Sequence, residues 1–70
     1  MTYIRMSIAR RSLLAILQRT SAREVAARCG VTPATVSAWV SGLARPRWRT
    51  RLVLRAAYGI TPSTWDTQAP

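Results

Sequence analysis

The central third of the sequence places two helix starts and two helix stops close together, and this punctuation limits the fold more than any other feature. Ser21 and Glu24 have the spacing of a capping box, in which two side chains satisfy the first free N–H groups of a helix. Gly30 can end that helix because glycine adopts the left-handed conformation. Thr32 is a second N-cap, and Pro33 suits the first helical position, where no N–H is needed. Gly42 is expected to end this second helix. The pattern predicts two short helices joined by a tight turn.

A further helix is expected before this pair. Apolar residues at the i, i+3, i+4 spacing of one buried face predict a helix over about residues 6–18. The expected inward residues of the first three helices are Met6, Ala9, Leu13, Ile16, Leu17, Val25, Ala26, Cys29, Val36, Trp39 and Val40. No convincing strand alternation is present, so we expect an all-α fold with residues 1–5 as a flexible arm.

A fourth helix is expected from Pro46 to about residue 58, followed by a short last turn over residues 62–65. Proline favours a helix start because its fixed backbone angle is already helical. Trp48, Leu52 and Ala56 recur at i, i+4 and i+8, which predicts that this stripe of the fourth helix faces the core.

Positive charge dominates the composition. Eleven arginines, with no lysine and no histidine, stand against Glu24 and Asp66 and give a net charge of +9. Such a surface favours a polyanion or an anionic membrane as partner. The usual catalytic and metal-binding sets need histidines or several carboxylates or cysteines, so we expect no enzyme, no metal, no cofactor and no small-molecule ligand. The lone Cys29 permits no intrachain disulfide and fits a reducing cytoplasm.

Apolar runs in the sequence are short. The run at residues 13–17 is shorter than the roughly 7–15 residues of a signal-peptide core. It is also far below the roughly 18 residues that a membrane span needs. We therefore expect no membrane segment.

Residues 22–41, AREVAARCGVTPATVSAWVS, resemble the helix-turn-helix of the Cro/CI-type (Xre-like) family of phage and bacterial regulators. The matching positions are Val25, Ala26, Gly30, Val31, Val36 and Trp39, then Gly42 and Pro46, and finally Gly59, Ile60, Thr61, Pro62 and Trp65. The resemblance implies a compact five-helix, lambda-repressor-like DNA-binding domain, here residues 6–66, with a frayed tail at 67–70. It also implies that residues 33–41 are a recognition helix in the major groove of duplex DNA.

The outward side of this recognition helix is small and neutral. At about 100° per residue from Val36, the residues that point away from the core are Ala34, Ser37, Ala38 and Ser41, with Thr35 at the flank. None of them can make the two-point contacts by which arginine reads guanine or glutamine reads adenine. We expect the helix to read groove shape, thymine methyl groups and bridging water.

Arginines at the edges of the motif are the expected source of stronger contacts. Arg23, Arg45 and Arg47 are candidates for base contacts, and Arg5 of the arm is a candidate for a minor groove. Arg47, Arg51 and Arg55 recur at i, i+4 and i+8 on the fourth helix and are expected to hold phosphates. The expected DNA-binding set is Arg23, Thr32, Pro33, Ala34, Thr35, Ser37, Ala38, Ser41, Arg45, Arg47 and Arg51.

These features predict a cytoplasmic, sequence-specific transcription regulator in a bacterial or phage-infected cell. A repressor is the expected type: phage Cro-like, the regulator of an accessory operon, or an antitoxin. We expect a homodimer on a pseudo-palindromic operator, with Val53, Leu54, Ala57 and the last turn as the dimer face. Two alternatives remain open: a non-specific or architectural nucleic-acid-binding protein, and a membrane-active cationic amphipathic helix over residues 6–19.

Overall fold

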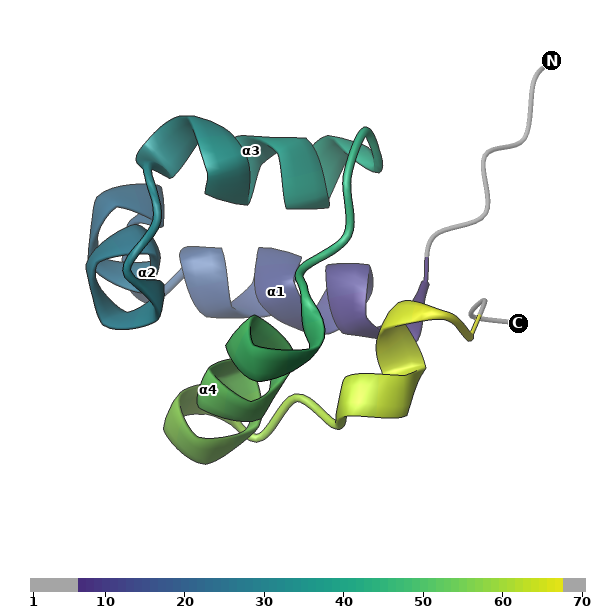
Figure 1. Ribbon diagram of the computed structural model, residues 1–70. Coiled ribbons are helices and arrows are strands. Elements are labelled where there is room, and N and C mark those ends of the chain that lie inside the picture. Colours follow the sequence, from purple (N-terminus) through teal and green to yellow (C-terminus); the bar gives the residue numbers. More distant parts are fainter. Residues whose placement is uncertain (1–6, 68–70) are drawn as a thin grey trace, which may run out of the picture.

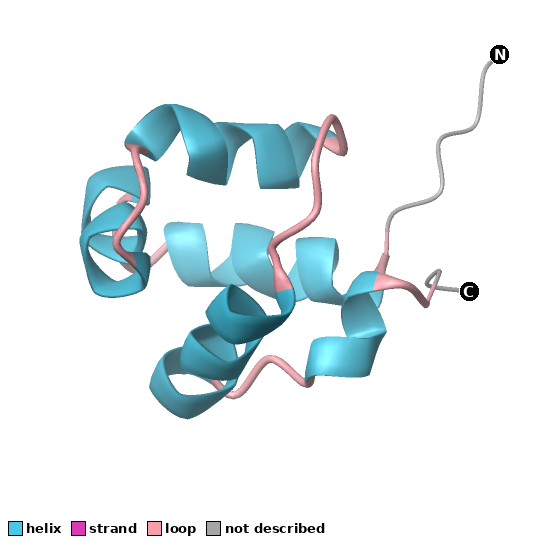
Figure 2. Cartoon of the chain, viewed as in Figure 1, coloured by secondary structure: helices cyan, strands magenta, loops and turns pink. Residues whose placement is uncertain are grey.

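The computed structural model describes residues 7–67, and the regular elements in that range are helices (Figure 2). They are α1 (Ile8–Leu17), α2 (Ala22–Cys29), α3 (Pro33–Ser41), α4 (Trp48–Tyr58) and the 3-10 helix η1 (Pro62–Trp65). The all-α prediction is confirmed, with the fifth expected helix reduced to one 3-10 turn. The expected arm, Met6 of the first helix and residues 68–70 lie outside the described residues.

The helices pack around one hydrophobic core. Figure 1 shows how they are arranged. In Figure 1, α3 lies above α1, α2 joins them at one end, and α4 and η1 lie below. α3 packs on α2 and α1, whereas α4 packs on α2 and η1. The two ends of the described chain meet where Ile8 N donates to the Thr67 carbonyl at 2.8 Å. Thr67, which we assigned to the frayed tail, is therefore held by a backbone hydrogen bond.

Local caps set the ends of α2. The Ser21 hydroxyl accepts from Glu24 N at 3.2 Å, as one half of a capping box requires. In place of the other half, the Glu24 carboxylate accepts from the Thr20 hydroxyl at 3.2 Å. Gly30 then ends α2 with a left-handed φ of 68°. Val31 N donates back to the Ala26 carbonyl at 3.0 Å, which closes the turn into α3.

The core lies between α1, α2, α3, α4 and η1. Its buried residues are Ala9, Leu13, Val25, Ala26, Val36, Trp39, Leu54, Ile60 and Trp65. Trp39 and Trp65 pack edge to face with ring centroids 6.2 Å apart, a favourable arrangement for aromatic rings. Trp65 is 1% exposed, so η1 serves to close the core. Ile16, Leu17, Cys29 and Val40 are partly buried against the same cluster.

The expected start and buried face of α4 were wrong. Arg47 has an extended backbone (φ −70°, ψ 161°) and is the N-cap, so the helix begins at Trp48 rather than at Pro46. Trp48 is 63% exposed and Leu52 43%, whereas Leu54 is fully buried. Residues two apart on a helix point in nearly opposite directions, so burying Leu54 turns Leu52 to solvent. α4 carries two apolar stripes, and the inner one runs through Leu54 and the half-buried Tyr58.

Candidate nucleic-acid interface

α3 buries one side and leaves the other open. Val36 and Trp39 anchor it in the core. On the opposite side Thr32, Pro33, Ala34, Ser37 and Ser41 are exposed, and Thr35 and Ala38 are half-buried. These are the seven small residues that the sequence placed at the interface, and the structure brings them together along one helix. The outward surface of α3 therefore has low relief and no charge.

Several hydroxyl groups on this surface are already engaged. The Thr32 hydroxyl accepts from Thr35 N at 3.3 Å and lies 3.0 Å from the Thr35 hydroxyl. The Ser41 hydroxyl donates to the Ala38 carbonyl at 3.1 Å. A hydroxyl has one proton to donate and two lone pairs, so Ser41 keeps the capacity to accept a hydrogen bond. A donor on an adenine or cytosine edge would suit it.

The C-terminal end of α3 is held by a residue that the sequence analysis did not single out. Arg10, in the first turn of α1, donates to the Val40 carbonyl from Nε at 3.0 Å and from Nη2 at 2.8 Å. We call this contact the Arg10 clamp. It joins residues 30 positions apart, so no local sequence signal announces it. Gly42 ends the helix just beyond the clamp, with a left-handed φ of 83°.

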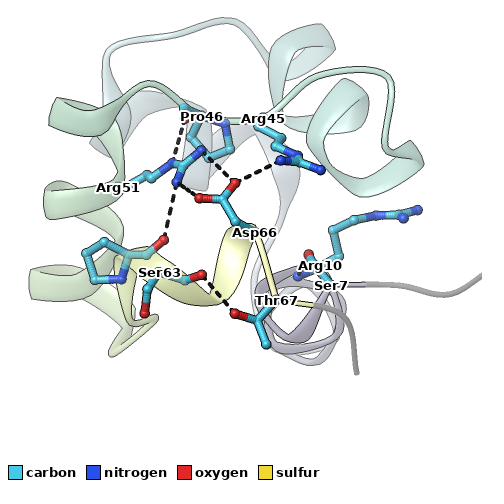
Figure 3. Close-up of polar contacts among 9 residues, drawn as sticks. Ser7, Arg10, Arg45, Pro46, Arg51, Ser63, Asp66 and Thr67 are labelled. Atoms are coloured by element: carbon cyan, nitrogen blue, oxygen red, sulfur yellow. Dashed lines mark hydrogen bonds and ion pairs between the residues drawn. The ribbon is translucent and has the colours of Figure 1, made fainter. Parts of the chain in front are cut away.

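Two of the predicted DNA-contacting arginines meet the same acid (Figure 3). Arg45 Nη1 lies 2.9 Å from Asp66 Oδ1, and Arg51 Nη1 lies 2.8 Å from Asp66 Oδ2. The side chain of Arg51 is only 14% exposed, against 65% for Arg45. Arg51 also donates to the carbonyls of Pro46 at 2.8 Å and Pro62 at 3.4 Å. We call these groups the Asp66 cluster. It fastens the start of α4 to η1.

Electrostatics within the Asp66 cluster follow from this geometry. The hydrogen bond from Arg51 lowers the pKa of Asp66 below its usual value, with further lowering from the charges of Arg51 and Arg45. Burial acts in the opposite direction and is outweighed. Asp66 is therefore ionised at neutral pH. Arg51 has a structural role, because its guanidinium donates hydrogen bonds to acceptors within the protein. Arg45 keeps most of its surface open.

The other candidate arginines lie on the surface. Arg23 is exposed in the first turn of α2, and Arg47 is exposed at the N-cap of α4. No side-chain hydrogen bond caps the start of α4, so its first N–H groups are open to an anion. Arg55 is exposed near the end of α4. Arg5 lies outside the described residues.

Ligand-binding features are sparse in the described part of the chain. Arg10, Arg45 and Asp66 are among the residues that line a cavity of about 100 Å³, which is smaller than the roughly 300 Å³ of an ordinary ligand pocket. Residues 7–67 hold no cluster of acidic, cysteine or histidine side chains suited to a metal ion. None of their helices is long and apolar enough to cross a membrane. Burial raises the pKa of the Cys29 thiol, which disfavours the reactive thiolate.

Comparison with known families gives one match. A family model described as Helix-turn-helix matches residues 11–65, which contain α2, α3, α4, η1 and most of α1. No curated protein and no solved structure matches the chain.

Proposed function

Because the chain belongs to the Cro/CI-type (Xre-like) helix-turn-helix family of DNA-binding transcription regulators, we propose that it is a sequence-specific repressor. The observation that carries the proposal is the exposed surface of α3, which bears no charge. Along the chain an exposed arginine precedes α3 at Arg23 and another follows it at Arg47. In this arrangement α3 lies in the major groove and α2 crosses the DNA backbone.

Base recognition in this proposal comes from the outward side of α3. Ala34, Ser37 and Ser41 face the bases, with Thr35 and Ala38 beside them. Such side chains contact thymine methyl groups, accept hydrogen bonds and admit water, but they form no two-point contact with a base. Thr32 and Pro33 lie at the start of α3, where the proposal places them close to the sugar-phosphate backbone of the DNA. The predicted specificity is therefore modest at each base pair and depends on how closely α3 approaches the groove floor.

Affinity in this proposal comes from the arginines at the edges. Arg23, Arg45 and Arg47 are exposed and contact phosphates or bases at the rim. The uncapped start of α4 supports a phosphate contact beside Arg47. Arg51 is removed from the proposed set because its donors serve the Asp66 cluster. The phosphate stripe that we expected along α4 is therefore reduced to Arg47 and Arg55.

A homodimer on a pseudo-palindromic operator remains part of the proposal, with a revised face. Leu54 belongs to the core and cannot contribute. We define the outer face of α4 by three exposed apolar residues. Trp48 is 63% exposed, Leu52 43% and Val53 37%. An exposed apolar patch of this kind is typical of a protein interface. We place the dimer contact there, with Ala57 at its margin.

The cellular setting is proposed on simpler grounds. A lone cysteine fits the reducing cytoplasm of a bacterial or phage-infected cell. Whether the regulator is phage Cro-like, serves an accessory operon or acts as an antitoxin depends on its neighbouring genes. The membrane-active alternative is disfavoured because α1 already buries Ala9 and Leu13 in the core.

A selection from random duplex DNA, followed by gel-shift titration at two salt concentrations, tests the proposal. We expect a motif of two repeated half-sites, about one helical turn apart, that stays bound at the higher salt. The logarithm of the binding constant should fall with log salt at a slope of about −0.9 per phosphate neutralised. Binding that selects no motif and disappears at the higher salt would instead establish the non-specific, architectural alternative.

A further inference from the structure

We infer that Arg10 is a positioning residue for DNA recognition: it fixes the C-terminal end of α3 relative to α1 without itself reading a base. The inference rests on the proposed function, because positioning matters only if α3 reads sequence. It concerns a residue of α1 that is absent from the set of DNA-contacting residues proposed above.

The Arg10 clamp satisfies an acceptor that α3 cannot satisfy itself. The last carbonyl groups of a helix have no partner within it. The Trp39 carbonyl accepts from Gly42 N at 3.3 Å, and the Ala38 carbonyl accepts from Ala44 N at 3.3 Å. The Val40 carbonyl receives two donors of one guanidinium, at 3.0 and 2.8 Å. A cation at this end also interacts favourably with the helix dipole.

The guanidinium also packs against the residue that ends the helix. A Cβ atom added at Gly42 would lie 3.0 Å from Arg10 Nη1 and 3.1 Å from Arg10 Cζ, closer than side chains normally approach. The φ of 83° favours glycine at this position, and any larger residue would also make the Arg10 guanidinium shift by a few tenths of an ångström. In Figure 3 the Arg10 side chain points away from the Asp66 cluster. Its guanidinium donates to the Val40 carbonyl at the end of α3 instead.

The two ends of α3 are held differently, which is why the clamp matters for recognition. The start of α3 follows a closed turn, in which Val31 N donates to the Ala26 carbonyl at 3.0 Å. The chain beyond α3 enters an exposed loop, where Leu43 is 87% exposed. Ser41 lies in the last turn of α3 and faces outward. Without the clamp, a tilt of this turn would move Ser41 relative to the bases.

The test replaces the two-donor geometry while keeping the charge. Arg10→Lys retains a cation but replaces the planar fork that places two donors on one carbonyl. Arg11→Lys is the matched control, because Arg11 is the exposed neighbour on the same helix. We expect Arg10→Lys to lower the ratio of specific to non-specific DNA affinity about tenfold. Non-specific affinity should be unchanged, and Arg11→Lys should alter the ratio less than about twofold.

Amide hydrogen exchange gives a second measurement that needs no DNA. Arg10→Lys should speed exchange in the last turn of α3, at Val40 and Ser41, and leave α2 unaffected. Equal loss of protection in α2 and α3 would show a general stabilising role and overturn the inference. An unchanged affinity ratio, with wild-type exchange in α3, would also overturn it. If the wild-type protein itself prefers no sequence, the proposed function fails, and the exchange measurement alone decides whether Arg10 holds α3.

Discussion

α3 and α4 present surfaces of opposite character. α3 buries its large residues, Val36 and Trp39, and shows small neutral side chains to solvent. α4 buries Leu54 and leaves Trp48 and Leu52 exposed among arginines. In the proposed function this contrast corresponds to a division of roles, in which α3 enters a groove of the DNA and α4 supplies apolar area and charge. Substitutions matched between the two sides of α4, or between its arginines, test this contrast.

The largest expected effect separates the two sides of α4. Leu54→Ala removes a fully buried side chain, and we expect it to lower the free energy of unfolding by about 2–5 kcal/mol. Leu52→Ala, two residues away and 43% exposed, should cost less than about 1 kcal/mol in the monomer. Urea denaturation at low protein concentration measures both. If both variants lost the same free energy of unfolding, Leu52 on the outer face of α4 would also be packed within the monomer.

The next effect concerns the outer face of α4 in assembly. Trp48→Ala should weaken the proposed dimer by about 2 kcal/mol, as expected when a large aromatic side chain is removed from an interface. Leu43→Ala is the control, because Leu43 is 87% exposed but lies in the α3–α4 loop. Sedimentation equilibrium measures the dimer constant. A Trp48→Ala protein that dimerises as the wild type does would move the dimer contact away from this face.

A smaller effect separates a structural arginine from a DNA-contacting one. Arg51→Met leaves the Pro46 carbonyl without its 2.8 Å donor and should lower the free energy of unfolding by about 1–2 kcal/mol. Arg47→Met should leave stability within about 0.5 kcal/mol. The salt slope of DNA binding should instead become shallower by about 0.9 for Arg47→Met, which reports one lost phosphate contact. The reverse result would exchange the roles of the two residues.

The smallest expected effect is a pH dependence from the Asp66 cluster. The folded pKa of Asp66 is lowered, so its ion pairs stabilise the fold above the unfolded pKa of about 3.9. That contribution should be lost as pH falls through the lower, folded pKa. Thermal melts from pH 7 to pH 2 measure it. Asp66→Asn should remove this part of the acid sensitivity, and an unaltered pH profile would show that the pairs add no stability.

Local signals allowed α2 and α3 to be predicted from the sequence. Thr32, Pro33 and the glycines at Gly30 and Gly42 act on neighbouring backbone, and the structure has each of them in its expected role. Such signals need only a few adjacent residues. The boundaries of this pair and the outward side of α3 could therefore be derived before any contact was known.

Long-range contacts explain what could not be predicted. α4 has two apolar stripes, and Leu54 rather than Trp48 is buried in the helix that packs on α2 and η1, elements distant in the sequence. Arg51 has the same local pattern as a phosphate-binding arginine, yet Asp66, 15 residues away, engages it. The Arg10 clamp likewise depends on where α3 ends in space. A pattern of charges along one helix does not reveal such partners.

The small outward side chains of α3 also affect how readily this surface can acquire a preference for a different DNA sequence. At Ala34 and Ser37, both exposed, a longer side chain would extend into solvent without displacing a packed neighbour. A change to glutamine or arginine there would add a two-point base contact that the present side chains cannot make, so a new operator preference can arise with little loss of existing contacts. A recognition helix already filled with long side chains must lose one contact to acquire another. Evolution or engineering of new specificity on this scaffold therefore begins from a surface of small, neutral side chains.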